Sequence, residues 1–249
     1  GPSTTVTLAW DDSGRAALIE LDDPRTLNAL TEELMRTLAE KISFASASRT
    51  VRALVLRAAG PHFCTGGRYE KKQLTRTPLP WWLRARGICG TGAVFDRIRT
   101  ASALSFSVLH GSSIGGGLLL GLAADHRVAT RNATFRLGVA PHGLSPVVMA
   151  TRVLPLLVGG AYSTRMYVED LRVDREYAIE SGVVKYLLPD AWAARRFVES
   201  SARVGSGTFA SSSMAIAHHA CHHCQESFLD VEAGQNVSDG LTTIPARVR

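Results

Sequence analysis

The sequence predicts an α/β domain. Short apolar runs that suit β-strands alternate along the chain with segments whose apolar residues recur at helical spacing. This alternation is typical of α/β architectures. The length of 249 residues suits one large domain, or a core with a small C-terminal extension, and is enough to bury a substantial core. Hydrophobic residues make up 45% of the chain and charged residues 20%, as in ordinary globular proteins.

The first elements that the sequence predicts are a strand, a turn and a helix. Residues 16–21 have the composition of a strand, and the Asp-Asp-Pro at 22–24 ends it. In the helix that follows, apolar residues recur near helical spacing at Leu34, Leu38, Ile42 and Ala45. Thr31, Glu32 and Glu33 suit its first turn, because acidic side chains there complement the helix dipole.

Two glycine-rich turns follow the next two predicted strands. Residues 51–57 form a compact apolar strand candidate, and the later segment 62–67, His-Phe-Cys-Thr-Gly-Gly, ends in paired glycines. Such glycines permit unusual backbone angles and the close approach of a ligand. Residues 104–110 alternate as a strand should, and the glycine-rich residues 111–117 then lead into an apolar helix at 118–124.

The rest of the sequence predicts one more strand, followed by a mostly helical region. Residues 125–130 are the strand candidate, and the later half, including residues 191–204, has a helical composition. We find no internal repeat of the solenoid kind.

The two glycine turns carry the chemistry that the sequence suggests. A glycine turn that leads into a helix presents free backbone N–H groups, with the positive end of the helix dipole behind them, and so stabilises negative charge. A nucleotide phosphate loop is not favoured, because no Gly-Lys-Ser/Thr follows and the glycines lack the dinucleotide-binding spacing. Close backbone packing alone also produces such turns, so either turn by itself identifies no ligand.

Together and in this order, the turns resemble those of the crotonase superfamily, the enoyl-CoA hydratases and isomerases. The segments that carry the resemblance are residues 23–30, 62–67, 111–125, 178 and 181–184. The resemblance implies the crotonase fold, in which repeated ββα units form a spiral core. It places this core at residues 1–190 and a C-terminal helical region, for oligomerisation and active-site capping, at residues 191–249. It also implies a homotrimer or a dimer of trimers.

The family joins one N–H from each turn into an oxyanion hole. Carried over residue by residue, the resemblance assigns these donors to Gly67 and to Gly116, the middle glycine of the triple run. A thioester carbonyl polarised there becomes an enolate when electrons arrive from the neighbouring bond. The fold leaves open which reaction delivers those electrons.

The sequence departs from the hydratases of the family at two positions. Those enzymes use two glutamates to position and activate water, and here the corresponding residues are Leu119 and Val139. Neither side chain can exchange a proton, so we expect no hydratase activity. We assign Leu119, Val139 and Tyr69 to substrate binding.

A subgroup resemblance suggests what replaces hydration. Residues 115–122, 124–125 and 142–146 resemble the decarboxylases of polyketide β-branching pathways, which also have an apolar run after the triple glycine. This implies a lyase that decarboxylates a 3-methylglutaconyl group on an acyl carrier protein. Loss of carbon dioxide releases electrons into the conjugated thioester without a base. The alternatives are double-bond isomerisation or another enolate reaction, with the acyl group on a carrier protein or CoA, and a catalytically degenerate binding or scaffold protein.

The subgroup places a lysine, and sometimes also a tyrosine, on the helix after the first turn, with a histidine from a C-terminal helix, to hold a carboxylate and supply a proton. Its lysine would fall near Thr75 here, whereas Lys71 occupies its tyrosine position. If this segment is helical, the four-residue spacing puts Lys71 on the same face as Gly67. Lys71 is therefore the candidate that contacts the substrate carboxylate or delivers the proton.

Histidines are the other candidates for the proton donor. His142 follows the altered glutamate turn, and a C-terminal cluster that includes His222 also contains His218, His219 and His223. The cluster with Cys221 and Cys224 could suggest zinc, but its members lie on one predicted helix and no second ligand pair follows. We therefore expect no metal, and the resemblance implies no redox cofactor.

Charge and cysteine content limit partners and location. The net charge of +6 would attract CoA phosphates, an acidic carrier protein or nucleic acid. Nucleic acid is not favoured, because the chain has no motif of interleaved aromatic and basic residues. Four cysteines suit a reducing compartment. No apolar stretch is long enough to span a bilayer, and Gly1-Pro2-Ser3 resembles a protease scar. We therefore expect a cytoplasmic protein that does not bind a membrane.

Overall fold

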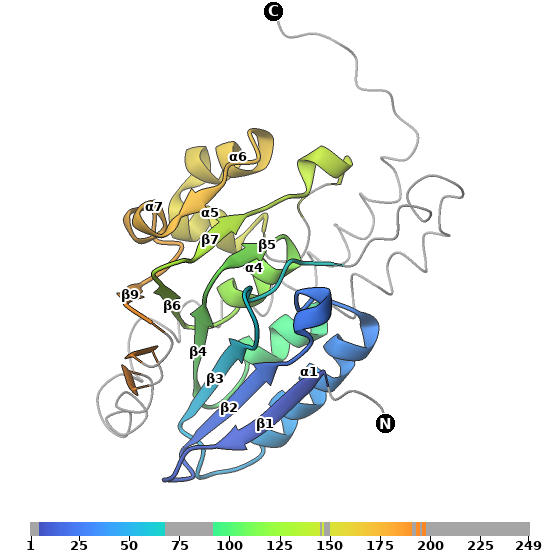
Figure 1. Cartoon of the computed structure of the whole chain (residues 1–249), viewed down its shortest axis with the longest axis vertical. Helices are drawn as coiled ribbons and strands as arrows, with labels where there is room; N and C mark the ends of the chain where they lie inside the picture. Colours follow the sequence, from blue (N-terminus) through green and yellow to red (C-terminus); the bar gives the residue numbers. More distant parts are fainter. Residues whose placement is uncertain are drawn as a thin grey trace, which may run out of the picture.

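The computed structural model describes residues 5–67, 92–144, 146, 150–190, 193–194 and 196–197, and these form an α/β arrangement (Figure 1). The main sheet has six strands in the order β1 (Val6–Trp10), β2 (Ala16–Leu21), β3 (Ala53–Ala58), β4 (Leu104–Leu109), β6 (His126–Thr130) and β9 (Tyr186–Leu188). A smaller sheet has three strands in the order β5 (Ser112–Ile114), β7 (Thr134–Arg136) and β8 (Val173–Asp174).

Helices alternate with these strands. In chain order they are η1 (Pro24–Thr26), α1 (Glu32–Ser46), the helical residues 92–99, α4 (Gly116–Leu122), η2 (Ala140–His142), α5 (Val153–Val158), α6 (Gly160–Val168) and α7 (Arg175–Glu180). The expected ββα unit recurs as β1-β2-α1 and as β4-β5-α4. No helix within the described ranges is long and apolar enough to cross a membrane.

The parallel pairing explains why strands β2 and β3 are apolar on both faces. β1 pairs antiparallel with β2, whereas β2, β3, β4, β6 and β9 pair in parallel. Parallel sheets are normally covered on both sides, so their strands are continuous apolar runs. In β2, Ala17 and Ile19 belong to the large core on one face, and Ala16 and Leu18 belong to a smaller core on the other.

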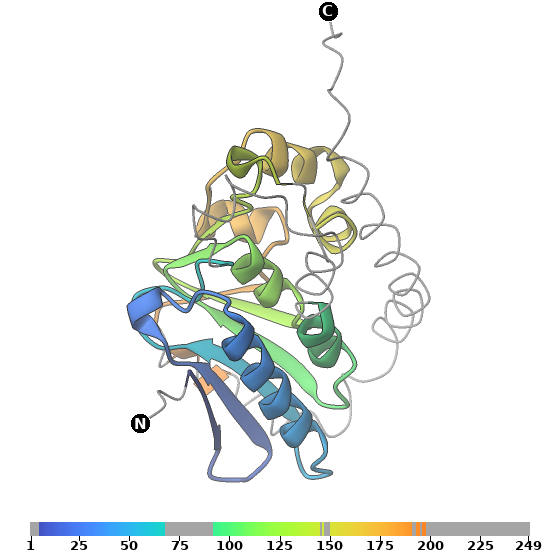
Figure 2. The same cartoon turned by 90° about the vertical axis from the view of Figure 1, so that its right-hand side faces the viewer.

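Helix α1 covers one face of the sheet, as its apolar spacing predicts. Leu34, Leu38 and Ile42 are buried in the large core. The hydroxyl of Thr31 caps the helix by accepting a hydrogen bond from the N–H of Leu34 at 3.1 Å, which confirms the predicted N-terminus. The helical residues 92–99 lie beside α1 (Figure 2). The two helices are joined by a hydrogen bond that the guanidinium of Arg97 donates to the hydroxyl of Ser43.

One predicted element is wrong in detail. Residues 111–117 are not a simple turn, because Ser112–Ile114 form strand β5 and pair with Thr134–Arg136 of β7. This pairing depends on a partner far along the chain, which local composition does not reveal. In the later half, the strands β7, β8 and β9 interrupt the predicted helices for the same reason.

The second face of the sheet carries a buried histidine. His126 of β6 is 8% exposed and stacks on Phe106, with ring centroids 4.9 Å apart. Its Nδ1 has no hydrogen-bond partner among the described residues. Burial lowers the pKa of His126, and the charge of Lys185 lowers it further. The neutral ring is therefore the form that this core accepts.

We predict that His126→Phe stabilises the protein. Phenylalanine keeps the aromatic stacking and removes the unpaired nitrogen, so the free energy of unfolding at pH 7 should rise by about 1 kcal/mol. A histidine with a lowered folded pKa contributes stability that is complete above its unfolded pKa of about 6.5 and is lost as the pH falls below it. Urea unfolding at pH 7 and pH 5 should therefore show a larger gain at pH 5. Equal gains at both values would contradict the buried neutral ring.

Candidate active site

The two glycine turns predicted from the sequence lie against each other. The N–H of Cys64 donates to the carbonyl of Ser112 at 3.3 Å, and the N–H of Ile114 donates to the carbonyl of Cys64 at 3.0 Å. These two hydrogen bonds form a parallel bridge between Cys64 and Ser113. The end of the first turn is thereby attached to strand β5, directly before helix α4.

Two glycines are required by this close approach. A Cβ atom on Gly117 would lie 2.2 Å from the carbonyl oxygen of Cys64. Gly66 has a φ of +90°, and a Cβ there would lie 2.7 Å from the carbonyl oxygen of Ile114. Neither position has room for a side chain, and the backbone angle of Gly66 is one that other residues rarely adopt. Close packing thus accounts for Gly66 and Gly117.

The peptide planes orient the N–H groups of Gly67 and Gly116. The carbonyl of Gly66 accepts a hydrogen bond from the N–H of Leu30 at 2.8 Å, and in a trans peptide the N–H of Gly67 points the opposite way. The carbonyl of Gly115 accepts from the N–H of Leu119 at 3.1 Å, so the N–H of Gly116 points out of the start of α4.

The structure brings these two predicted donors together. A Cβ atom on Gly116 would lie 3.9 Å from the nitrogen of Gly67, and a Cβ on Gly66 would lie 3.4 Å from the nitrogen of Gly116. Gly67 is exposed and Gly116 is half-buried, so both are within reach of solvent. The pair therefore offers two neighbouring backbone donors at the molecular surface.

Asn28 holds the first turn in place. It is fully buried, with a left-handed φ of 55°. Its Nδ2 donates to the carbonyls of Ala59 at 2.9 Å and His62 at 3.0 Å, and its Oδ1 accepts from the N–H of Asp23 at 2.9 Å. The sequence motif includes Asn28, but the motif alone does not show this role, because two of its partners, Ala59 and His62, lie far along the chain.

Apolar residues occupy both altered glutamate positions, and another covers the second turn. Leu119 is 5% exposed in the core, and Val139 is half-buried and packs against the same core. Leu30 lies over Gly116, since its Cδ1 is 2.7 Å from the position that a Cβ on Gly116 would take. None of these three side chains can exchange a proton.

The titratable groups around the two turns have defined environments. Burial raises the pKa of the Cys64 thiol to about 12, so this thiol stays protonated and unreactive near neutral pH. The Nδ1 of His62 accepts a hydrogen bond from the N–H of Ser112 at 3.1 Å, so this nitrogen is unprotonated in the structure. His142 ends η2, where its side chain is exposed.

Several predicted site residues cannot be placed. Tyr69, Lys71, Thr75 and the histidines from His218 to His223, including His222, lie outside the described residues. Their roles stay predictions. In the part of the chain that the structure does describe, no group of three His, Cys, Asp or Glu side chains is arranged to hold a metal ion.

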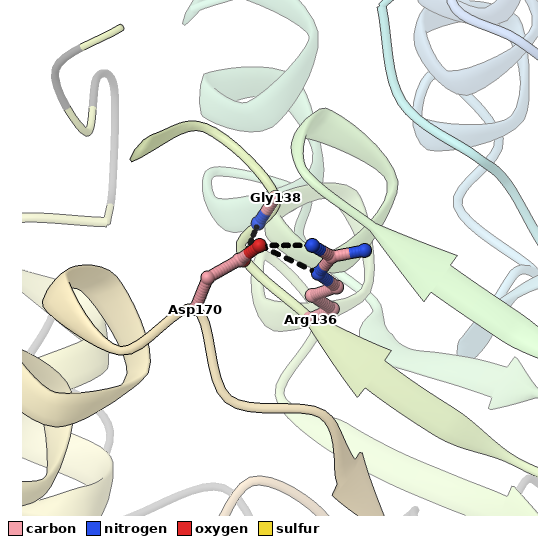
Figure 3. A network of polar contacts seen from close by, with 3 residues as sticks. All are labelled: Arg136, Gly138 and Asp170. Carbon is pink, nitrogen blue, oxygen red and sulfur yellow. Dashed lines mark hydrogen bonds and ion pairs between the residues drawn. The ribbon is translucent and has the colours of Figure 1, made fainter. Parts of the chain in front are cut away.

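Sequence reasoning missed a polar network beside Val139 (Figure 3). Asp170, in the loop after α6, accepts hydrogen bonds through Oδ2 from Nε of Arg136 at 2.8 Å and from Nη2 of the same residue. Its Oδ1 accepts from the N–H of Gly138 at 2.9 Å. The hydrogen bond to Asp170 raises the pKa of Arg136, so the guanidinium stays charged. No sequence motif marks this network.

Comparison with known proteins identifies relatives of the chain. The family model described as "Enoyl-CoA hydratase/isomerase" matches residues 12–233. The probable enoyl-CoA hydratase echA12 of Mycobacterium leprae is 32% identical over 180 residues, which are 70% of this chain and 60% of that protein. The ethylmalonyl-CoA decarboxylase of Xenopus tropicalis is 26% identical over 184 residues, 74% of this chain and 60% of that protein.

A solved structure confirms the fold. The enoyl-CoA hydratase from Bacillus halodurans superposes with a TM-score of 0.80 at 22% identity, covering 93% of this chain and 92% of that one. The curated relatives are longer than the region that matches. In the first three, the match to this chain covers 60 to 69% of the relative's length.

Proposed function

The chain belongs to the enoyl-CoA hydratase/isomerase family, and from this premise we propose that it is an enzyme that stabilises a thioester enolate between the N–H groups of Gly67 and Gly116. The observation that carries the proposal is the pair of neighbouring backbone donors, each pointing away from the hydrogen-bonded carbonyl of its own peptide group. Two fixed donors stabilise negative charge on an oxygen without rearranging during the reaction.

The proposed reaction is decarboxylation of a 3-methylglutaconyl-type acyl group. The bond between the carboxylate and the acyl chain breaks, carbon dioxide leaves, and the bonding electron pair moves through the conjugated system onto the thioester oxygen. That oxygen, now part of a dienolate, accepts hydrogen bonds from Gly67 and Gly116. Return of a proton to carbon re-forms the thioester carbonyl. The balance requires no base, oxidant or metal.

The apolar replacements favour this reaction over the alternatives. Hydration and isomerisation both need a group that moves a proton onto or off the substrate before or during enolate formation, and Leu119 and Val139 cannot do so. Decarboxylation needs a proton donor only at the end. Lys71, His142 and His222 are the candidates for that step, and Tyr69 for substrate contact. The Xenopus relative is named a decarboxylase, which supports the assignment of this chain to the lyases.

The net charge of the chain is the basis for proposing which group carries the acyl substrate. A chain of net charge +6 suits either the phosphates of CoA or an acidic acyl carrier protein. We propose the carrier protein as the first choice, with a homotrimer or a dimer of trimers as the assembly. A scaffold protein without activity is the remaining alternative, and the two outward N–H groups argue against it.

The test is intact-mass analysis of a glutaconyl carrier protein, with glutaconyl-CoA in parallel, after incubation with the protein. We expect the acyl group to lose the mass of one carbon dioxide. An unchanged mass with a shifted ultraviolet absorption would establish isomerisation instead. No change on either carrier would favour the scaffold reading.

The same preparation should not hydrate crotonyl-CoA. The reason is that Leu119 and Val139 stand where a hydratase needs glutamates, so the rate should stay near that of the buffer control. Loss of the enoyl absorbance measures it. A rate comparable with ordinary hydratases would show that other side chains activate water and would refute the assigned roles of these two residues.

A further inference from the structure

Asp170 binds the end of strand β7 from a distant segment of the chain. It lies in the loop between α6 and β8 and has a left-handed φ of 49°. Figure 3 shows its carboxylate directed at Arg136 of β7 and at the N–H of Gly138, the residue before Val139. The Asp170 side chain is 11% exposed, whereas that of Arg136 is 44% exposed. The largely buried carboxylate therefore anchors a more exposed guanidinium.

The backbone of Arg136 reaches the second glycine turn. Its carbonyl accepts a hydrogen bond from the N–H of Gly115 at 3.0 Å, and Arg136 is paired with Ile114 in the β5–β7 ladder. The peptide that follows Gly115 carries the N–H of Gly116. Asp170 is thus linked through Arg136 to the turn that orients this donor.

Packing leaves little slack between these segments. A Cβ atom on Gly138 would lie 2.8 Å from Cγ2 of Ile114, and a Cβ on Gly115 would lie 3.4 Å from the carbonyl oxygen of Leu137. A shift of the β7 end would therefore be transmitted to β5 and to the start of α4. Tightly packed contacts pass on such displacements instead of absorbing them.

We propose that Asp170 is a positioning residue: it holds the end of β7 so that the Gly116 N–H and the Val139 side chain keep their places around the thioester. The proposal rests on the proposed function. Asp170 touches no substrate and acts through Arg136 and Gly138. Hydrogen bonds between charged groups are short and directional, which suits them to fixing a backbone.

The test compares Asp170→Asn with Glu169→Gln. Asparagine tolerates the left-handed backbone and can keep the bond to Gly138, but its amide cannot pair with Arg136 as a carboxylate does. Glu169 is the matched control, because it is the adjacent residue and its carboxylate pairs with Arg165 on the exposed face of α6. Both variants lose one negative charge.

The probe is acetoacetyl-CoA, whose enolate absorbs in the near ultraviolet and forms more readily when its oxygen is held by two donors. In Asp170→Asn we expect the enolisation of bound probe to weaken about tenfold to 10²-fold, as for a small misplacement of a donor, with a smaller change in binding affinity. Glu169→Gln should match the wild type. Equal enolisation in Asp170→Asn and the wild type would overturn the proposal.

Amide hydrogen exchange separates this proposal from the proposed function. Asp170→Asn should speed exchange in peptides covering residues 112–118 as well as residues 136–140, and Glu169→Gln should not. If the wild-type protein fails to enolise the probe, the oxyanion function is wrong, and the exchange data still decide the role of Asp170. Faster exchange confined to residues 136–140, or none, would show that Asp170 does not position the second turn.

Discussion

Replacing Gly116 with proline should lower turnover of the thioester substrate by about 10²–10³-fold while the protein stays folded. Proline has no N–H, so the variant removes one of the two proposed oxyanion donors. Gly116 is the first residue of α4, a position where proline is tolerated because the helix makes no use of that N–H. The measurements are kcat, KM and the thermal unfolding midpoint. The loss should appear mainly in kcat, because the donor acts on charge that develops in the transition state.

A matched proline control exists in the same chain. Gly160 is the first residue of α6 and follows the N-cap Gly159, just as Gly116 follows the N-cap Gly115. A Cβ on Gly160 meets no atom within 4 Å. Gly160→Pro should therefore keep full activity and a similar unfolding midpoint.

The side chain of Leu30 has to be separated from the lost donor. Its Cδ1 would lie 2.7 Å from a Cβ at position 116, so the proline ring must push it aside. In a Leu30→Ala background this obstacle is absent. If Leu30→Ala restores the turnover of Gly116→Pro, the loss is steric and the Gly116 N–H is not an oxyanion donor.

The elements that could be predicted from the sequence are those whose signals are local. The apolar spacing of Leu34, Leu38 and Ile42 and the cap at Thr31 lie within one helix, and the structure confirms both. The pairing of the two glycine turns could be expected because a resemblance supplied it, and the bridge between Cys64 and Ser113 places them together. Their chemical use remains a proposal.

What could not be predicted depends on contacts between distant segments. Strand β5 exists because residues 112–114 pair with β7, and a Ser-Ser-Ile segment between glycines does not by itself predict a strand. The carboxylate of Asp170 finds Arg136 only once the α6–β8 loop is folded beside β7. The adjacent Glu169 also carries a carboxylate, and it forms an ion pair with Arg165 on the surface. The sequence gives no reason to expect that Asp170, rather than Glu169, binds the end of β7.

Gly117→Ala should destabilise the protein by about 3 kcal/mol or more, the upper range for a side chain forced into a packed core. The added Cβ would lie 2.2 Å from the carbonyl oxygen of Cys64 and 2.8 Å from its carbonyl carbon, and a backbone carbonyl cannot rotate out of the way as a side chain can. Relief requires α4 to move from the first turn. Urea unfolding gives the change in free energy, and Cys64 should become accessible to a thiol reagent as the contact opens.

Gly121→Ala, one helical turn further along α4, is the control that distinguishes packing from helix propensity. Its added Cβ would lie 2.9 Å from Cδ2 of Leu109, the flexible end of a side chain, so a small adjustment suffices. Alanine also favours a helix over glycine by about 1 kcal/mol, so the net change should be close to zero. Because the same substitution in the same helix should then differ by about 3 kcal/mol between positions 117 and 121, the difference measures the contact between α4 and Cys64. Similar stabilities for the two variants would mean that the turns are not held together by this close approach, and that Gly116 and Gly67 are free to separate.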